Sequence, residues 1–173
     1  MDVSVQIRPE TTLAAEERAT LDALDHAIFH DHPFANTVAW SDPHWRVLVL
    51  GDGAIVSHLQ VFERIGRHGD RAVRIAGIGA VMTPPAFRGR GFASIALDRT
   101  RQWVFDELQV DLGLLFCVAE IVPFYAERGW IVVGSSVWVQ QPHGTIQWPH
   151  TTMVLPRDLR RWLDAPIDLC GYP

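Results

Sequence analysis

Lysine is absent from this sequence of 173 residues. Its fifteen basic residues are all arginine, and twenty acidic residues leave a formal net charge of −5. A negative balance of this kind argues against nucleic acid as a partner and favours a cationic one.

Cysteine is scarce and long apolar runs are missing. The two cysteines, Cys117 and Cys170, are too few for a disulfide framework and too far apart for a metal clip. The eight histidines have no nearby cysteine pair or His-Glu motif, so we expect no metal site. No apolar run approaches the length of a membrane span, and the first residues lack the basic start and apolar stretch of a secretion signal. We therefore expect a cytoplasmic protein without a membrane partner.

Hydrophobic residues make up 48% of the chain, enough for the core of one domain over residues 1–173. Alternating or continuous apolar runs predict strands at 3–8, 45–50, 54–64, 74–83, 112–118, 130–133 and 151–155. Helical spacing predicts helices after a Thr12 cap to about residue 28, at 93–108 and at 121–128, and 140–149 is expected to be a loop. This order predicts an α/β domain with a mixed central sheet. Strands 74–83 and 112–118 should be parallel, joined by the long helix in a right-handed crossover.

The stretch from Ala80 to Ala93 joins an apolar strand, a glycine-rich arginine turn and the start of the long helix. The free N–H groups of such a turn face an anion at the positive end of the helix dipole. Gly89 and Gly91 allow a close approach to the backbone, while Arg88 and Arg90 add positive charge. We expect a phosphate to bind here.

The pattern Arg88-x-x-Gly91-x-Ala93 resembles the acyl-CoA pyrophosphate loop of the GCN5-related N-acetyltransferases. An Arg-Gly-Arg-Gly string also fits a plain turn or a nucleic-acid patch, but the flanking strand and helix favour the cofactor loop. The resemblance implies acetyl-CoA as acyl donor, with its pyrophosphate on residues 88–93, Phe92 included. It also implies that the two parallel strands splay apart and that backbone groups of Val81, Met82 and Thr83 hold the pantetheine arm.

Acyl transfer to an amine needs an acid for the leaving thiolate, donors for the oxyanion and a proton acceptor. Tyr125-x-x-x-Gly129-Trp130 resembles the family's Tyr-x-x-x-Gly-aromatic pattern, which makes Tyr125 the candidate acid. The alternative is a half-buried aromatic residue on a short helix. The oxyanion donor would be the amide of Met82 or Thr83.

The proton acceptor is less well defined. Many members of the family carry a glutamate nine residues before the loop arginine, and this position is Gly79 here. The candidates are Glu63 on the preceding strand, Glu120 at the start of the short helix, His58 and Asp31. Each has the alternative of an ordinary surface or structural group.

A narrower resemblance, to aminoglycoside 2′-N-acetyltransferases, covers most of the chain. It is carried by Ile55–Arg64, the cofactor loop, Tyr125–Trp130, Gly144-Thr145 and Val154–Pro156. It implies that an acidic residue after the first helix, here Asp31, contacts a cationic amino sugar, and we expect His58 and His143 to be further substrate contacts. His143 stands where those enzymes have a carboxylate, which suits a smaller or differently charged sugar amine such as kasugamycin.

Two other functions remain open at this stage. The same chemistry can act on a peptide N-terminus, a polyamine or another small amine. A binding module that senses acyl-CoA without catalysis is the alternative from another class, because Gly79 offers no base. Relatives are commonly dimers, and the exposed strand 3–8 can pair, so a homodimer is also an expectation.

Overall fold

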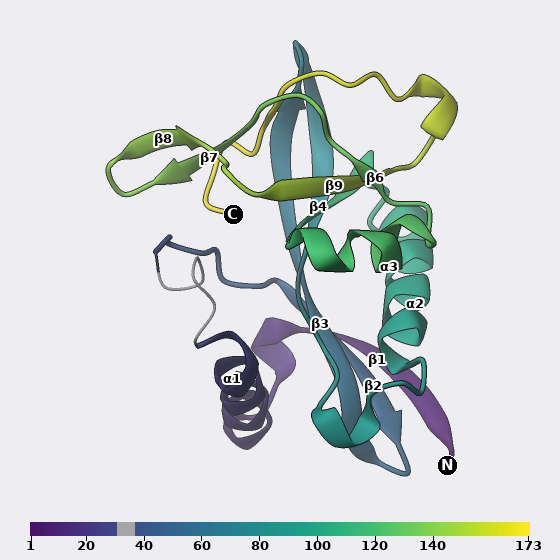
Figure 1. The fold of residues 1–173 in the computed structure, drawn as a ribbon. Coiled ribbons are helices and arrows are strands. Elements are labelled where there is room, and N and C mark those ends of the chain that lie inside the picture. The colour runs from purple at the N-terminus through teal and green to yellow at the C-terminus, as the bar shows by residue number, and fades with distance from the viewer. Residues whose placement is uncertain (31–36) are drawn as a thin grey trace.

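The computed structural model describes residues 1–30 and 37–173. Its strands form one ten-stranded mixed sheet, and Figure 1 shows the long strands β3 and β4 running through the centre of the molecule. The strands are β1 (Val3–Pro9), β2 (Trp45–Gly51), β3 (Ala54–His68), β4 (Arg71–Met82), β5 (Leu112–Cys117), β6 (Ile131–Val132), β7 (Val137–Gln141), β8 (Gly144–Gln147), β9 (Thr151–Pro156) and β10 (Ile167–Asp168).

Three α-helices accompany the sheet in the described part of the chain: α1 (Ala15–Phe29), α2 (Phe92–Asp106) and α3 (Val122–Ala126). Short 3₁₀ turns occupy Glu10–Thr12, Pro85–Phe87, Ala119–Ile121 and Leu159–Arg161. None of the described helices is long and apolar enough to cross a membrane.

The two long helices cover opposite faces of the first strands (Figure 1). Successive side chains of a strand point to opposite faces, so Val47 and Val49 of β2 join the core under α2 while Leu48 packs with Leu21 of α1. A third cluster, around Ile75, Leu114 and Val139, fills the space toward β7 and β10. The sheet is therefore enclosed on both sides near its middle.

The predicted parallel crossover is present. Ile75–Ile78 of β4 pairs with Leu112–Leu115 of β5 in parallel register, and α2 connects the two strands. The pairing ends at Ile78 and Leu115, although both strands continue. Gln60 of β3 pairs with Gly79 and His58 pairs with Met82, so strand β4 has one residue more than β3 over this interval. Ala80, within this interval, adopts a φ of 45°. Such a bulge bends its strand, and beyond it β4 and β5 are no longer paired.

Two local expectations were wrong, and one strand was missed. Thr12 does not cap α1: the helix begins after Ala14, whose N–H donates to Glu17 Oε2 at 2.9 Å, while the Thr12 hydroxyl donates to the Pro9 carbonyl. The expected loop 140–149 contains most of the β7–β8 hairpin, which pairs Trp138 with Gln147. The two-residue strand β10 was not expected, because its sequence carries no strand pattern and its pairing with β3 and β7 is entirely tertiary.

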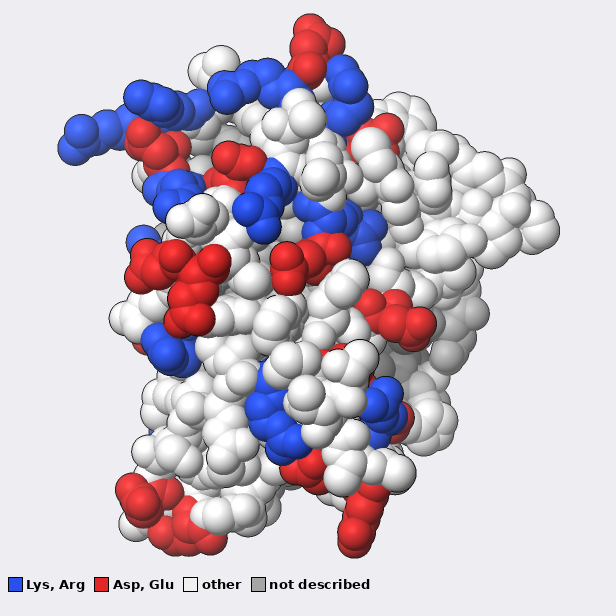
Figure 2. Space-filling model, turned by 180° about the vertical axis from the view of Figure 1, so that it is seen from behind, with Lys and Arg blue, Asp and Glu red and all other residues white. Residues whose placement is uncertain are grey.

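The surface seen in Figure 2 carries mixed charge. Arginine and acidic side chains are interspersed there, with arginines gathered toward the end of the molecule that carries the β3–β4 turn. Charges of both signs therefore lie side by side on this face.

Candidate active site

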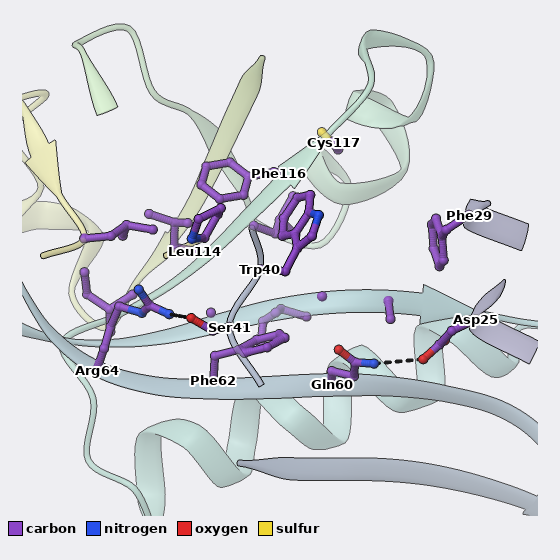
Figure 3. A pocket seen from close by; sticks show the side chains of 18 of the residues that line it. Asp25, Phe29, Trp40, Ser41, Gln60, Phe62, Arg64, Leu114, Phe116 and Cys117 are labelled. Carbon is purple, nitrogen blue, oxygen red and sulfur yellow. Dashed lines mark hydrogen bonds between the residues drawn. The ribbon is translucent and has the colours of Figure 1, made fainter. Parts of the chain in front are cut away.

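Two cavities meet where β4 and β5 separate. The first, here called the loop cavity, has a volume of about 440 Å³ and is lined by Val81, Met82, Thr83, the turn 87–89, residues 91–94, Ile28, Ile121, Phe124 and Tyr125. The second, the sheet cavity, has about 430 Å³ and extends along β3, β4 and β5 (Figure 3). Ala80 lines the sheet cavity and Val81 the loop cavity, and Ile121 lines both. A group bound in one can therefore approach a group bound in the other.

The backbone of the glycine-rich turn is built to receive an anion. Gly89 and Gly91 have φ values of 73° and 80°, and a side chain added at either would meet no atom within 4 Å. Gly91 is the N-cap of α2, and its carbonyl accepts the first helical bond from Ile95 N–H at 3.1 Å. The N–H groups of Phe92, Ala93 and Ser94 precede that bond and have no partner within the helix. These features fit the pyrophosphate of a coenzyme.

The two loop arginines are placed differently. Arg88 lines the loop cavity and donates from Nε to the Thr83 carbonyl at 3.1 Å, which ties the turn to the end of β4. Arg90 is exposed, does not line the cavity, and its guanidinium lies 5.3 Å from the centre of the Phe92 ring. Arg90 therefore contributes positive electrostatic potential around the loop rather than a direct contact within the cavity.

The end of β4 is held from the neighbouring strand. The Ser57 hydroxyl lies 2.7 Å from the Met82 carbonyl, to which it donates, and 2.9 Å from Thr83 Oγ1. Met82 is buried, and its main chain faces His58 in the β3–β4 ladder. The backbone of residues 81–83 is thus fixed along one wall of the loop cavity.

Tyr125 lies in the same cavity as these backbone groups. Its side chain is only 5% exposed, packed near Phe124 and Trp130. Burial, with a smaller contribution from Cys117, raises the pKa of Tyr125 well above its usual value of 10. The phenol therefore keeps its proton at neutral pH, as a proton donor must.

The other sequence candidates are scattered. Glu63 points to the opposite face of β3 from the sheet cavity, where its Oε1 accepts a 2.6 Å bond from Trp45 Nε1. Glu120 is exposed in the 3₁₀ turn before α3, and His143 is exposed in the β7–β8 turn. None of the three lines either cavity. Asp31 lies outside the described residues.

Gly79 lines the sheet cavity, and the space beside it is already filled. A Cβ at this position would come within 2.9 Å of Cε2 of Phe62, on the adjacent strand. The aromatic ring therefore occupies the position that a side chain on Gly79 would need, so a carboxylate there would require the ring to move.

A charged cluster that the sequence reading missed lies under α1. Arg46, whose side chain is only 3% exposed, is within ion-pair distance of Glu10 (2.8 Å), Asp22 (3.2 Å) and Asp25 (3.1 Å). Burial alone would lower the pKa of Arg46, but hydrogen bonds and charges from Glu10 and Asp25 outweigh it and raise the pKa. Glu10 also pairs with Arg18 at 3.4 Å, so three carboxylates against two guanidinium groups leave one net negative charge beside this end of the cavity.

Asp25 is the member of the cluster that lines the sheet cavity, with 18% of its side chain exposed. Its Oδ2 accepts a 2.8 Å bond from Gln60 Nε2 (Figure 3), and its Oδ1 lies 3.2 Å from Nε2 of the buried His58, without hydrogen-bond geometry. His58 itself lines neither cavity and reaches the site only through Asp25. The sequence signal was a pair of acids, Asp22 and Asp25, beside the apolar stripe of the first helix.

This fold and this glycine-rich turn are typical of an acetyltransferase domain. A family model described as an acetyltransferase (GNAT) domain matches residues 15–133, and the chain belongs to that family. The family uses acetyl-CoA as acyl donor. Among the described residues, no three His, Cys, Asp or Glu side chains are grouped to hold a metal ion.

The comparisons with individual proteins are more distant. The chain is 27% identical over 117 residues to an aminoglycoside 2′-N-acetyltransferase of Mycolicibacterium fortuitum; the match covers 64% of this chain and 59% of that protein. Escherichia coli ElaA has a similar structure, with a TM-score of 0.64 at 16% identity over 88% of this chain and 99% of ElaA. A Brucella melitensis GNAT acetyltransferase in complex with acetyl-CoA gives 0.62 at 12% identity over 95% and 94%. At these identities the solved structures show the shared fold.

Proposed function

We propose that this protein transfers the acetyl group of acetyl-CoA to an amine of an amino sugar of the aminoglycoside class, with the 2′-amine as the position. The observation that carries the proposal is the meeting of the two cavities at Ala80, Val81 and Ile121. An acyl donor in the loop cavity and an amine in the sheet cavity can react only at such a junction. The relative from M. fortuitum supports the sugar and the position.

Three steps of the transfer, namely donor binding, oxyanion stabilisation and protonation of the thiolate, have residues suited to them. The amides of the turn and of residues 92–94 would bind the pyrophosphate, and the backbone of Val81, Met82 and Thr83 would direct the thioester toward the junction. The amide of Met82 or Thr83 would stabilise the oxyanion. Tyr125 would give its proton to the departing thiolate.

The negative cluster supplies the attraction for the amine. Asp25 lies at the sheet cavity, and with Asp22 and Glu10 it keeps the region negative by one charge despite Arg46 and Arg18. An ammonium group is therefore drawn to this end before it loses a proton to solvent water and attacks as the neutral amine. Acetylation would remove one positive charge from an aminoglycoside and weaken its hold on RNA phosphates, which confers resistance.

The test is acetyl-CoA consumption with a panel of amines, read by thiol release and by a mass increase of one acetyl group on the acceptor. We expect turnover with at least one aminoglycoside and none with peptides of the same charge. Turnover with a peptide N-terminus or a polyamine but with no aminoglycoside would replace the proposed acceptor. If the protein bound acetyl-CoA but consumed it with none of the amines, an acyl-CoA sensor would be favoured.

A further inference from the structure

The sheet cavity has opposite charges at its two ends. Gln60, Phe62 and Arg64 alternate along β3 and so face the cavity together, as Figure 3 shows. At one end Gln60 donates a hydrogen bond to the negatively charged Asp25, and at the other end lies the positively charged Arg64. Arg64 lies four positions beyond Gln60 on the strand, which is about 13 Å at roughly 3.3 Å per residue.

The Asp25 end is the reacting end. Gln60 pairs with Gly79, next to Ala80 and the loop cavity, whereas Arg64 pairs with Ile75, further from that junction. An acceptor with its amine at the junction must therefore extend toward Arg64. Between the ends the walls are apolar, with Phe62, Leu114 and Phe116.

Arg64 differs from Arg46 in its partners. Arg46 has three carboxylates, but among the described residues no carboxylate lies within ion-pair distance of the Arg64 guanidinium. Arg64 donates instead to the Ser41 hydroxyl at 2.8 Å and to the Tyr172 carbonyl. Burial lowers its pKa, and the Cys170 thiol opposes this only in part. A half-buried cation held by neutral groups at a cavity wall is suited to bind an anion.

We propose that the acceptor is a zwitterion: an amine that also carries a carboxylate or another anionic group, which binds Arg64 while the amine lies at Asp25. The inference rests on the proposed acetyl transfer and narrows its substrate class. It also predicts discrimination, because a second ammonium at the far end of the ligand would meet Arg64 and be repelled.

The test compares acceptors that differ in the distal charge. One matched pair is 8-aminooctanoate and 8-aminooctanamide, whose chain is long and apolar like the cavity. The other comparison is kasugamycin, an amino-sugar antibiotic with a carboxylate, against tobramycin, a polycation that has a 2′-amine and no carboxylate. We expect kcat/KM to be at least tenfold higher for each anionic member, with the difference mainly in KM.

Substitutions test whether Arg64 is the source of the preference for an anionic acceptor. Arg64→Leu should bring the ratio within the matched pair close to one, and Arg64→Lys should restore part of it. Arg67→Leu is the control, because Arg67 lies on the same strand but is exposed and outside the cavity. The wild-type ratio needs no variant, so it still decides the matter if the Arg64 variants fold poorly.

The outcomes separate the two claims. Equal or better turnover of the amide and of tobramycin, or an unchanged ratio in a folded Arg64→Leu protein, overturns the zwitterion while acetyl transfer stands. If the wild type consumes acetyl-CoA with no member of the panel, the proposed transfer to amino sugars falls, and the zwitterion falls with it.

Discussion

The loop cavity and the sheet cavity are built in different ways. Most of the loop cavity comes from one continuous segment, residues 81–94, and much of its expected binding is by main chain. The sheet cavity draws on α1, on residues 40–41, on three strands and on the C-terminal residues. Main-chain binding tolerates sequence change, so a family can share its donor site. A cavity made of side chains from distant segments can change its ligand with a few substitutions.

The sharpest test of the loop cavity is Tyr125→Phe. The change removes the proton donor and leaves the ring, so turnover should fall by about 10²- to 10⁴-fold while acetyl-CoA affinity stays the same. Steady-state rates and calorimetric titration with acetyl-CoA measure the two effects. The control is Tyr172→Phe, at the only other tyrosine, which lies outside the loop cavity. Full turnover in Tyr125→Phe would remove the phenol from the reaction.

The pH dependence of the wild type extends this test. Burial raises the pKa of Tyr125 above its ordinary value of 10, so the phenol loses its proton only at a higher pH than a free tyrosine does. As the pH is raised to about 10, turnover should therefore not decline through loss of this proton. If kcat fell as the pH was raised through neutrality, and this fall disappeared in Tyr125→Phe, the raised pKa of Tyr125 would be contradicted.

A second change breaks the loop cavity at its backbone. Gly91→Val places a branched side chain at a φ of 80°, in the left-handed region, where it also stands at the anion site. We expect acetyl-CoA affinity to fall by at least about tenfold, or roughly 1.4 kcal/mol of binding free energy. Gly53→Val is the matched control, because Gly53 has a φ of 85° and equally open surroundings in the β2–β3 turn. If both variants lost affinity equally, the loop would not be the pyrophosphate site.

The loop cavity could be predicted from sequence because its signals are local. A strand, a Gly-x-Gly turn and an amphipathic helix follow one another, and Tyr125 sits at a fixed spacing from Gly129 and Trp130. The parallel pairing of β4 with β5 was predicted for the same reason. Strand β10 was not, since only its contacts with β3 and β7 make it a strand.

The sheet cavity could not be predicted in this way. Asp25 and Gln60 are 35 residues apart, and Arg64 meets a hydroxyl 23 residues before it and a carbonyl 108 residues after it. Glu63 was a reasonable candidate because it is a carboxylate. Neighbouring residues of a strand point to opposite faces, however, and the Glu63 side chain points away from the sheet cavity. His58 was placed on the correct strand, yet it is fully buried behind Asp25.

Asp25→Asn tests the negative end of the sheet cavity. The amide keeps the shape and can still accept from Gln60, but it no longer attracts an ammonium group. We expect KM for the amine to rise about tenfold, with a small effect on kcat and none on acetyl-CoA affinity. Asp98→Asn, on the exposed side of α2, removes the same charge far from the cavity and should change neither value. An unchanged KM in Asp25→Asn would place the amine elsewhere.

The last prediction concerns stability rather than kinetics, at the floor of the sheet cavity, where Gly79 and Phe62 compete for one space. Gly79→Ala puts a methyl group within 2.9 Å of the Phe62 ring, so the ring or the strand must shift. The free energy of unfolding should fall by about 1–3 kcal/mol, or a few degrees in Tm. In a Phe62→Ala background the same change should cost almost nothing, because the ring is gone; a double-mutant cycle by thermal denaturation measures the difference. Equal costs in both backgrounds would mean that the ring does not exclude a side chain at Gly79.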